Sequence, residues 1–262
     1  MDDRELGRIW DGNADAWTLL SRQGYDIYRD YLNTPAFLAM LPDVSGLRGL
    51  DIGCGEGHNT RLLAARGADM TGVDISPKFL QYAWEKEPER QLGIRYLTAS
   101  GSALPFADES FHFAAAFMSL MDMANHDEAV REAYRVLKPR GFFQFSITHP
   151  CFNTPRFKNV YDESGARVAV ECGDYFNQQP GRIEEWIFGS APEELKRTLP
   201  RFRVPRFCRT LSSWMNLLID AGFVIERIEE PYADDEVVEK CPHLADTRIV
   251  AYFLHMRWGK AG

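Results

Sequence analysis

Three glycines and an acidic residue stand where a bound ligand could meet the backbone. The stretch Leu50–Thr60, LDIGCGEGHNT, places Gly53, Gly55 and Gly57 directly after a short apolar run. Glycine tolerates backbone angles that other residues avoid, so this spacing predicts a sharp turn or a close approach to a ligand. Further along the chain, Asp74 in GVDIS could accept two hydrogen bonds from a ribose diol. Together these features predict a nucleoside site, which glycines alone would indicate only weakly.

A regular alternation of strands and helices would place this turn at one edge of a sheet. Strands joined by helical crossovers run parallel, and runs such as FAAAFM, apolar on both faces, fit a sheet covered on both sides. We therefore predict an α/β protein with a doubly wound, Rossmann-like sheet of seven mostly parallel strands, helices on both faces and an inserted α+β cap. Strands are expected at 47–53, 68–74, 94–98, 111–120, 141–148, 224–230 and 247–258, and helices at 59–67, 76–87, 127–138 and 211–223.

Two segments lie outside this alternation. Residues 1–45 are helical and aromatic, and we assign them to an N-terminal helical lid. Residues 151–210 hold short β-like pieces between prolines, and an insertion of this length typically serves as a lid or a substrate-binding element, so we assign them to a substrate cap. The main domain then comprises 46–150 and 211–262. Aromatic side chains in the lid and the cap could line the site, but we favour ordinary packing between helices for any single one of the lid aromatics; the candidates are Trp17, Tyr25, Tyr28, Trp186 and Phe188.

Composition and charge restrict the classes of function. The net charge of −8 argues against a general nucleic-acid binder, because phosphate binding needs a basic surface. The basic run Lys196–Arg209 is favoured as a solvated surface, with a local site for an acidic molecule as the alternative. The charged N-terminus predicts no signal peptide, and no apolar stretch reaches the length of a membrane span. The five scattered cysteines form no C-x-x-C pair, so we expect a reduced, cytoplasmic protein without structural zinc.

The spacing of the glycines bears on which nucleoside is bound. A dinucleotide enzyme usually carries G-x-G-x-x-G, whereas this chain has G-x-G-x-G preceded by Asp51. The motifs LDIGCGEG, GVDIS, ALPFADESFH and EAYRVLKPRGFF resemble, in order and spacing, those of class I S-adenosylmethionine-dependent methyltransferases. The similarity is to the small-molecule group that includes the ubiquinone/menaquinone-biosynthesis methyltransferases, and it covers residues 47–150.

The resemblance implies how S-adenosylmethionine would be held. Asp51 would orient the glycine loop near the amino group of the methionine moiety, and Gly53, Cys54 and Gly55 would lie against that moiety. Asp74 would bind the ribose hydroxyls. The remaining implied contacts are Ile75 against adenine, and Phe117 and Met118 under the cofactor near the methyl-bearing sulfur.

One position departs from the family pattern. The residue four before LPF is commonly an aspartate that contacts the adenine amino group, and here it is Ser100. The serine hydroxyl, or the backbone of Gly101 and Ser102, could still meet the adenine edge through a neutral contact.

His149 is the candidate general base. It follows the fifth predicted strand in SITHPCF, and the unperturbed pKa of histidine lies near neutrality. A hydrogen-bonded structural histidine before Pro150 is the competing interpretation, and the one we weight more heavily. Cys151 lies two residues further on, but with no third ligand in the pattern a metal site is not expected.

These inferences together predict S-adenosylmethionine-dependent methyl transfer to a small-molecule acceptor, through O, N or C. One alternative is a non-catalytic protein that binds the cofactor as a sensor or partner module, an option that Ser100 keeps open. The other is a nicotinamide-dependent oxidoreductase, which the glycine spacing and the LPF segment disfavour. Neither the acceptor nor the oligomeric state follows from the sequence.

Overall fold

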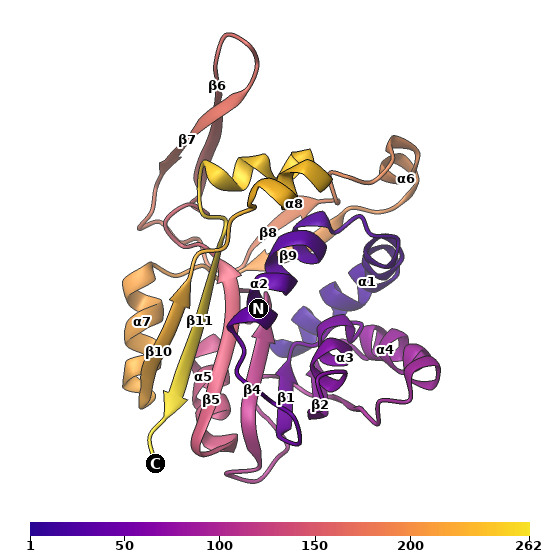
Figure 1. Cartoon of the computed structure of the whole chain (residues 1–262), viewed down its shortest axis with the longest axis vertical. Helices are drawn as coiled ribbons and strands as arrows, with labels where there is room; N and C mark the ends of the chain where they lie inside the picture. The colour runs from indigo at the N-terminus through magenta and orange to yellow at the C-terminus, as the bar shows by residue number, and fades with distance from the viewer.

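A seven-stranded sheet forms the centre of the molecule, in the order β10-β11-β5-β4-β1-β2-β3 (Figure 1). The computed structural model describes residues 1–262 and every side chain except that of Arg90. Only β11 runs antiparallel to its neighbours within this sheet, so the predicted doubly wound, mostly parallel fold is confirmed. The strands are β1 Arg48–Ile52, β2 Asp69–Asp74, β3 Arg95–Thr98, β4 Phe111–Phe117, β5 Leu137–Thr148, β10 Phe223–Glu229 and β11 Phe253–Lys260.

Helices cover both faces of the sheet and bury one apolar stripe each. On one face, α5 (His126–Val136) and α7 (Leu211–Asp220) pack into the core cluster that contains Leu50. On the other face, the cluster that contains Phe113 takes side chains from α2, α3 and α4. In α5 the buried positions recur at helical spacing, which fixes the face turned to the sheet. The helices of the second face are α2 Thr34–Met40, α3 His58–Ala64 and α4 Pro77–Arg90.

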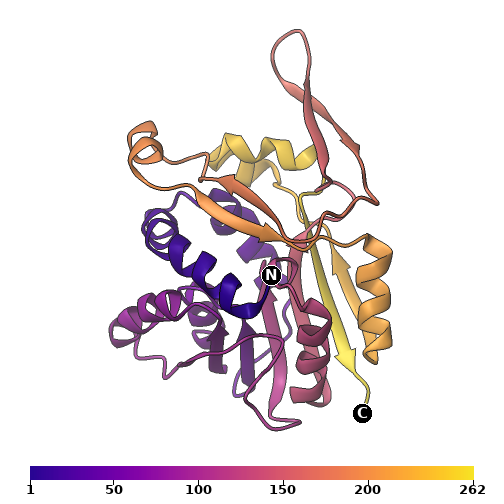
Figure 2. The ribbon, with the colours of Figure 1, turned by 180° about the vertical axis from the view of Figure 1, so that it is seen from behind.

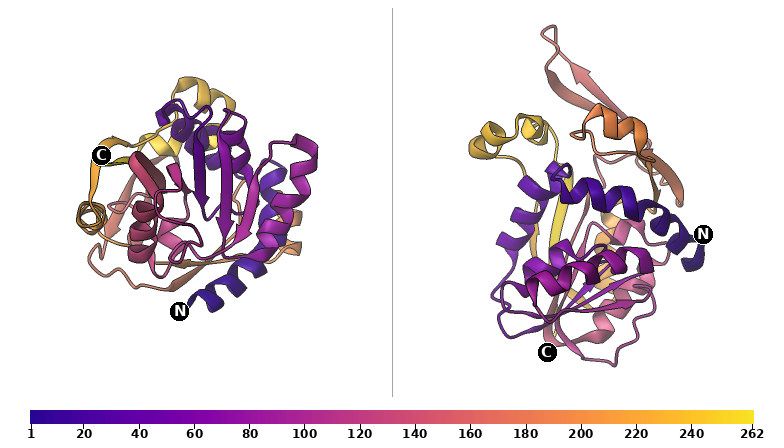
Figure 3. Two further views of the ribbon diagram at one scale, coloured as in Figure 1. Left: turned by 90° about the horizontal axis from the view of Figure 1, so that it is seen from below. Right: turned by 90° about the vertical axis from the view of Figure 1, so that its right-hand side faces the viewer.

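The N-terminal segment lies across the carboxyl ends of the strands. Helix α1 (Asp3–Arg22) contacts α4 at one side and β9 at the other, and Figures 2 and 3 show it between the sheet and the β8–β9 hairpin. Asp2 caps α1 by accepting a hydrogen bond from the Glu5 N–H at 2.7 Å. A short π-helix, η1 (Arg29–Asn33), then leads into α2.

The insertion folds as two hairpins and a short helix. Strands β6 (Arg156–Tyr161) and β7 (Arg167–Gly173) form a hairpin that projects from the body of the molecule (Figure 1). Strands β8 (Arg182–Trp186) and β9 (Phe202–Arg206) form a second hairpin, and α6 (Glu193–Thr198) lies in their connection. The segment therefore has the mixed α+β character that was expected.

Strand β5 begins earlier than the sequence predicts. A helix was expected to 138 and a strand from 141, but β5 starts at Leu137 and includes Pro139. Leu137 pairs with Phe111, and the register then shifts before Phe142 pairs with Phe113. The irregularity accommodates Pro139, which cannot donate to a regular ladder.

The last strand begins later than expected, and a helix precedes it. Thr247 and Arg248 belong to a 3₁₀ helix, η3 (Pro242–Arg248), instead of to a strand from 247. The Thr247 hydroxyl donates to the Leu244 carbonyl at 2.7 Å, and this local bond favours the turn over an extended strand. Helix α8 (Asp235–Lys240) was missed, although Asp234 caps it through the Val237 N–H. Among the described residues, no helix combines the length and the apolar composition needed to cross a bilayer.

Candidate active site

A cavity of about 1100 Å³ lies at the carboxyl ends of β1, β2 and β4, the edge at which open α/β sheets bind ligands. We call its lower side the floor: the loop ends 51–59, 74–75, 99–102 and 117–119. We call its upper side the roof: the lining residues of α1, 25–33, 166–167, 186–190, 204, 206 and 242–249.

The glycine loop is held in a shape that exposes its backbone to the cavity. The N–H groups of Gly53 and Cys54 both donate to the Val73 carbonyl, at 2.8 and 3.0 Å, which ties the loop to β2. Gly53 has φ +75°, and a Cβ there would lie 2.5 Å from the Ser119 Cβ. Gly55 has φ +55°, and a Cβ there would meet nothing within 4 Å. Gly53 thus permits close packing against Ser119, and Gly55 leaves open space next to its backbone.

Asp51 brings a partly unsatisfied carboxylate to the floor. It is 1% exposed, and its Oδ2 accepts a hydrogen bond from the Thr60 hydroxyl at 2.6 Å. Its Oδ1 is buried and has no hydrogen-bond partner among the described residues. Burial, with a contribution from the charge of Asp74, raises the pKa of Asp51 to about 7. A ligand donor that reached Oδ1 would satisfy this oxygen.

Asp74 links the end of β2 to the glycine loop. Its Oδ2 accepts from the Gly55 N–H and its Oδ1 from the Ser76 N–H, both at 2.8 Å. Burial raises its pKa to about 6, against these hydrogen bonds, which lower it. Each carboxylate oxygen can accept a second hydrogen bond, so the side chain keeps capacity for a ligand. The next residue, Ile75, also lines the cavity.

Ser100, Gly101 and Ser102 form the far end of the floor. The two serine hydroxyls lie 2.8 Å apart, and the Ser102 N–H donates to the Ser100 hydroxyl at 3.2 Å. A Cβ on Gly101 would lie 2.8 Å from a methyl carbon of Ile52, so the loop packs directly on β1. The Ser102 hydroxyl also donates to Asp3 Oδ2 at 3.2 Å.

Phe117 and Met118 line the cavity at the end of β4, where they were expected. Met118 has φ +51°, and its N–H donates to the Ser146 carbonyl at 3.0 Å. The Phe117 ring packs on Phe37 with centroids 4.0 Å apart. The structure therefore brings all eleven residues expected at the cofactor to one region: Asp51, Gly53, Cys54, Gly55, Asp74, Ile75, Ser100, Gly101, Ser102, Phe117 and Met118.

His149 does not line this cavity. It is 3% exposed, its Nε2 lies 2.7 Å from Glu230 Oε1, and its Nδ1 accepts from the Cys151 N–H at 3.2 Å. The His149 backbone N–H donates to the Tyr252 carbonyl at 2.8 Å, which continues the pairing of β5 with β11. The geometry gives no support to the base hypothesis, because both ring nitrogens already have protein partners. No group of three or more His, Cys, Asp or Glu side chains suited to a metal is found in the described part of the chain.

The sequence interpretation missed a buried ion pair beside the cavity. Arg206 donates to Asp122 Oδ1 at 2.7 Å and to Glu184 Oε2 at 3.2 Å. Burial raises the pKa of Asp122 to about 6, although the Arg206 charge acts in the opposite direction. Arg206 was grouped with the solvated basic run, yet it is 9% exposed and lines the cavity. Other members of that run pair with carboxylates as well: Lys196 with Glu193, Arg203 with Glu185 and Arg209 with Asp127.

A second polar cluster joins separate segments of the roof. Asp246 of η3 pairs with Arg167 of β7. Its Oδ2 also accepts from the hydroxyls of Tyr28, at 2.7 Å, and of Tyr252, at 3.3 Å. No local sequence pattern marks this cluster, because its members are far apart along the chain.

Aromatic rings form the apolar wall of the roof. The Trp17 ring lies 5.4 Å from Trp186 and 5.3 Å from Phe188, centroid to centroid, in edge-to-face arrangements. All three line the cavity, as do Tyr25 and Tyr28.

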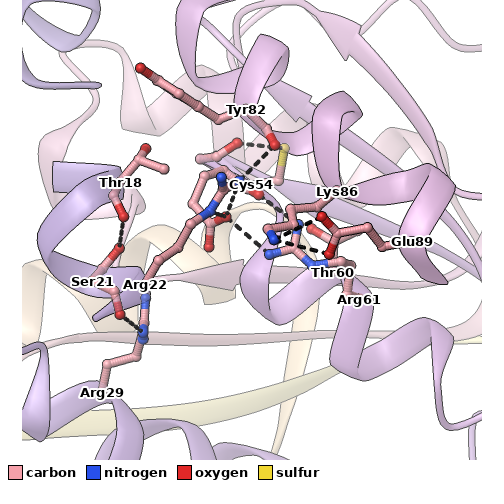
Figure 4. Close-up of polar contacts among 12 residues, drawn as sticks. Thr18, Ser21, Arg22, Arg29, Cys54, Thr60, Arg61, Tyr82, Lys86 and Glu89 are labelled. Carbon is pink, nitrogen blue, oxygen red and sulfur yellow. Dashed lines mark hydrogen bonds and ion pairs between the residues drawn. The ribbon is translucent and has the colours of Figure 1, made fainter. Parts of the chain in front are cut away.

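The roof is tied to the glycine loop through charged side chains. Glu56 accepts hydrogen bonds from Arg22 of α1 at 3.1 Å and from Arg61 of α3 at 3.0 Å. Arg29 lines the cavity and donates to the Ser21 carbonyl at 3.0 Å (Figure 4). Burial lowers the pKa of His58, at the start of α3, to about 4, and the Arg29 charge contributes to this shift. Arg29 and His58 line the same cavity.

Comparison with known proteins agrees with the fold. Residues 50–145 match the family described as "Methyltransferase domain". A demethylmenaquinone methyltransferase of Tropheryma whipplei is 39% identical over 123 residues, which is 47% of this chain and 51% of that protein. A malonyl-[acyl-carrier protein] O-methyltransferase of Pectobacterium atrosepticum is 32% identical over 124 residues, 47% of each chain.

A solved structure extends the similarity over most of the chain. The S-adenosylmethionine-dependent methyltransferase from Mesorhizobium loti is 30% identical, with a TM-score of 0.70, and the match covers 86% of this chain and 96% of that one. This chain belongs to the S-adenosylmethionine-dependent methyltransferases. It spans about half the length of the curated relatives it matches.

Proposed function

We propose that the cavity binds S-adenosylmethionine and that the protein transfers the methyl group to a small-molecule acceptor, through O, N or C. The unpartnered Oδ1 of buried Asp51, a residue that lines the same cavity as Gly55, carries this proposal. A buried carboxylate oxygen without a partner is costly, and the ammonium group of a methionine moiety would satisfy it. The hydrogen-bonding groups of the floor therefore fit the cofactor.

The residues of the floor divide among the parts of the cofactor. Gly53, Cys54 and Gly55 would pass along the methionine moiety, and Arg29, a cation of the same cavity lining, would meet its carboxylate. Asp74 would accept from the ribose hydroxyls through its remaining lone pairs. The remaining assignments are Ile75, Ser100, Gly101 and Ser102 at adenine, and Phe117 and Met118 near the sulfur.

The protein contributes position and exclusion of water. When bound, the cofactor supplies a sulfonium methyl group that is already a strong electrophile. The aromatic wall of Trp17, Trp186 and Phe188 would keep water from the acceptor and hold it in line with the methyl group. Aromatic ring faces also attract a sulfonium cation.

A small molecule fits the acceptor side better than a nucleic acid. The chain carries a net charge of −8, and much of its basic run is paired with carboxylates. The two relatives described above are named for acting on demethylmenaquinone and on a malonyl carrier protein, which supports a small or carrier-borne acceptor. All five cysteines are free, in keeping with a reducing, cytoplasmic setting.

Calorimetric titration tests this function. S-adenosylmethionine, S-adenosylhomocysteine and NAD are titrated into the wild type, Asp74→Ala and the control Asp69→Ala. Asp69 begins the same strand, but its side chain is exposed and pairs with Arg95. Micromolar binding of the first two ligands, weakened only by Asp74→Ala, is expected. Binding of NAD alone would contradict the proposal, and failure to form S-adenosylhomocysteine with any acceptor would leave a non-catalytic binder.

A further inference from the structure

The first turn of α1 places a carboxylate at the adenine end of the proposed site. Asp3 lines the cavity together with the loop Ser100–Ser102. Its Oδ2 accepts a hydrogen bond from the Ser102 hydroxyl at 3.2 Å, across a sequence separation of 99 residues. The lid therefore supplies an acid next to the position where the family commonly has one and this chain has Ser100.

The serines of this loop are poorly placed to replace that acid. Their hydroxyl oxygens lie 2.8 Å apart, and Ser100 also accepts from the Ser102 N–H. The Oδ1 of Asp3, in contrast, makes no hydrogen bond or ion pair with any described residue, and the side chain is only partly buried. A carboxylate is also the stronger acceptor, because hydrogen bonds to charged groups exceed those between neutral groups.

Helix α1 is fixed at this place by contacts along one face. Asp3, Gly7 and Asp11 follow one another at four-residue spacing, which aligns them on the helix. A Cβ on Gly7 would lie 3.3 Å from the Ile75 carbonyl oxygen, so the helix passes directly over the end of β2. Asp11 accepts from the Ser76 hydroxyl at 2.6 Å. Asp3 is thereby held in position relative to the loop beneath it.

We propose that Asp3 takes the place of the acid absent at position 100 and accepts a hydrogen bond from the 6-amino group of adenine. This assignment rests on the proposed function, since it assumes the cofactor on the floor. Helix α1 then covers the cavity and also selects the nucleobase.

A binding cycle between one side chain and one ligand group tests this proposal. The two ligands are S-adenosylhomocysteine and its analogue in which hydrogen replaces the 6-amino group of the purine. The proteins are wild type, Asp3→Ala, Asp3→Asn and the control Glu5→Gln. Glu5 is an exposed acid of the same helical turn, so the control removes equal charge from the helix start. Dissociation constants come from calorimetry, and thermal unfolding checks that each variant is folded.

The expected pattern is a loss of discrimination in one variant alone. Wild type and Glu5→Gln should bind the analogue about tenfold more weakly than S-adenosylhomocysteine, the effect of one hydrogen bond to a charged acceptor. Asp3→Ala should bind the two within about threefold, and Asp3→Asn, whose amide still accepts, should lie between. Discrimination that survives in Asp3→Ala, or is missing in wild type, overturns the assignment and leaves the proposed function intact. Failure of wild type to bind S-adenosylhomocysteine overturns both.

Discussion

The floor and the roof of the cavity are built in different ways. The floor consists of short loops at adjacent strand ends, and backbone groups make many of its contacts, as in the two N–H groups that bond to the Val73 carbonyl. The roof consists of side chains from distant segments, such as Tyr28, Arg167 and Asp246. A site made from consecutive residues leaves a pattern in the sequence, whereas one made from tertiary contacts does not. Most of the proposed cofactor contacts lie on the floor, with Arg29 and Asp3 added from the roof, and the rest of the roof would suit an acceptor particular to this protein.

The largest effect is expected where the floor permits no side chain. Gly53→Val would force a β-branched residue into φ +75° and place its Cβ 2.5 Å from Ser119. We expect a loss of about 4 kcal/mol in unfolding free energy, from strain and overpacking, and no detectable binding of S-adenosylhomocysteine. Urea unfolding and calorimetry measure the two effects. Gly12→Ala is the control, because this exposed helical glycine has open space and should gain up to about 1 kcal/mol. Normal binding by Gly53→Val would refute the role given to the loop.

The roof should separate stability from cofactor affinity. Arg206→Met leaves Asp122 buried without its cation, which should reduce the unfolding free energy by about 3 kcal/mol at pH 7. Binding of S-adenosylhomocysteine should change less than about threefold, because the floor is untouched. The double variant Arg206→Met/Asp122→Asn should recover part of the stability. Lys240→Met, which breaks an exposed pair with Glu236, should change stability by less than about 0.5 kcal/mol. A large loss of cofactor affinity in Arg206→Met would contradict the division between floor and roof.

The raised pKa of Asp51 gives the floor a pH dependence. The ammonium group of the ligand needs the carboxylate form, so with a pKa of about 7 the affinity for S-adenosylhomocysteine should rise about tenfold between pH 6 and 8. Asp51→Asn should remove most of this slope, and Asp69→Asn should retain it. Calorimetric titrations at several pH values measure this dependence. A wild-type affinity for S-adenosylhomocysteine that does not change with pH would contradict this role for Asp51.

The stability of the ligand-free protein should depend on pH in the opposite direction. Folded Asp51 holds a proton that the unfolded chain has released above about pH 4, so its contribution to stability falls as pH rises from about 4 to 7.

The smallest effect on turnover is expected at His149. Because its ring lies outside the cavity lining and is held by Glu230 and the Cys151 N–H, His149→Gln should change kcat by less than about threefold. A general base would contribute about 10²- to 10⁴-fold. Loss of the partly buried contact with Glu230 should still lower the unfolding free energy by about 1 kcal/mol. A hundredfold fall in kcat, together with a changed pH profile, would restore the base hypothesis.

The sequence predicted the sheet and the floor, and it failed where tertiary contacts decide. The glycine loop and Asp74 were accessible because turn chemistry and strand ends are local features. The predicted start of β11 was wrong because the Thr247 hydroxyl donates to the Leu244 carbonyl, a local bond that the hydrophobic pattern does not reveal. His149 was placed at the site by its nearness to a strand end, but its ring contacts Glu230 and the Cys151 N–H and does not line the cavity. Arg206 was interpreted as part of a charged run, and only the fold shows that Asp122 and Glu184 surround it.

A crystal structure of the complex with S-adenosylhomocysteine tests the central claim most directly. We expect the ligand amino group at Asp51 Oδ1, the ribose hydroxyls at Asp74 and the purine beside Ser100–Ser102. The part of the cavity under the roof should remain free for an acceptor. Density for the ligand among the roof residues, with the glycine loop and Asp74 left without contact, would contradict the account.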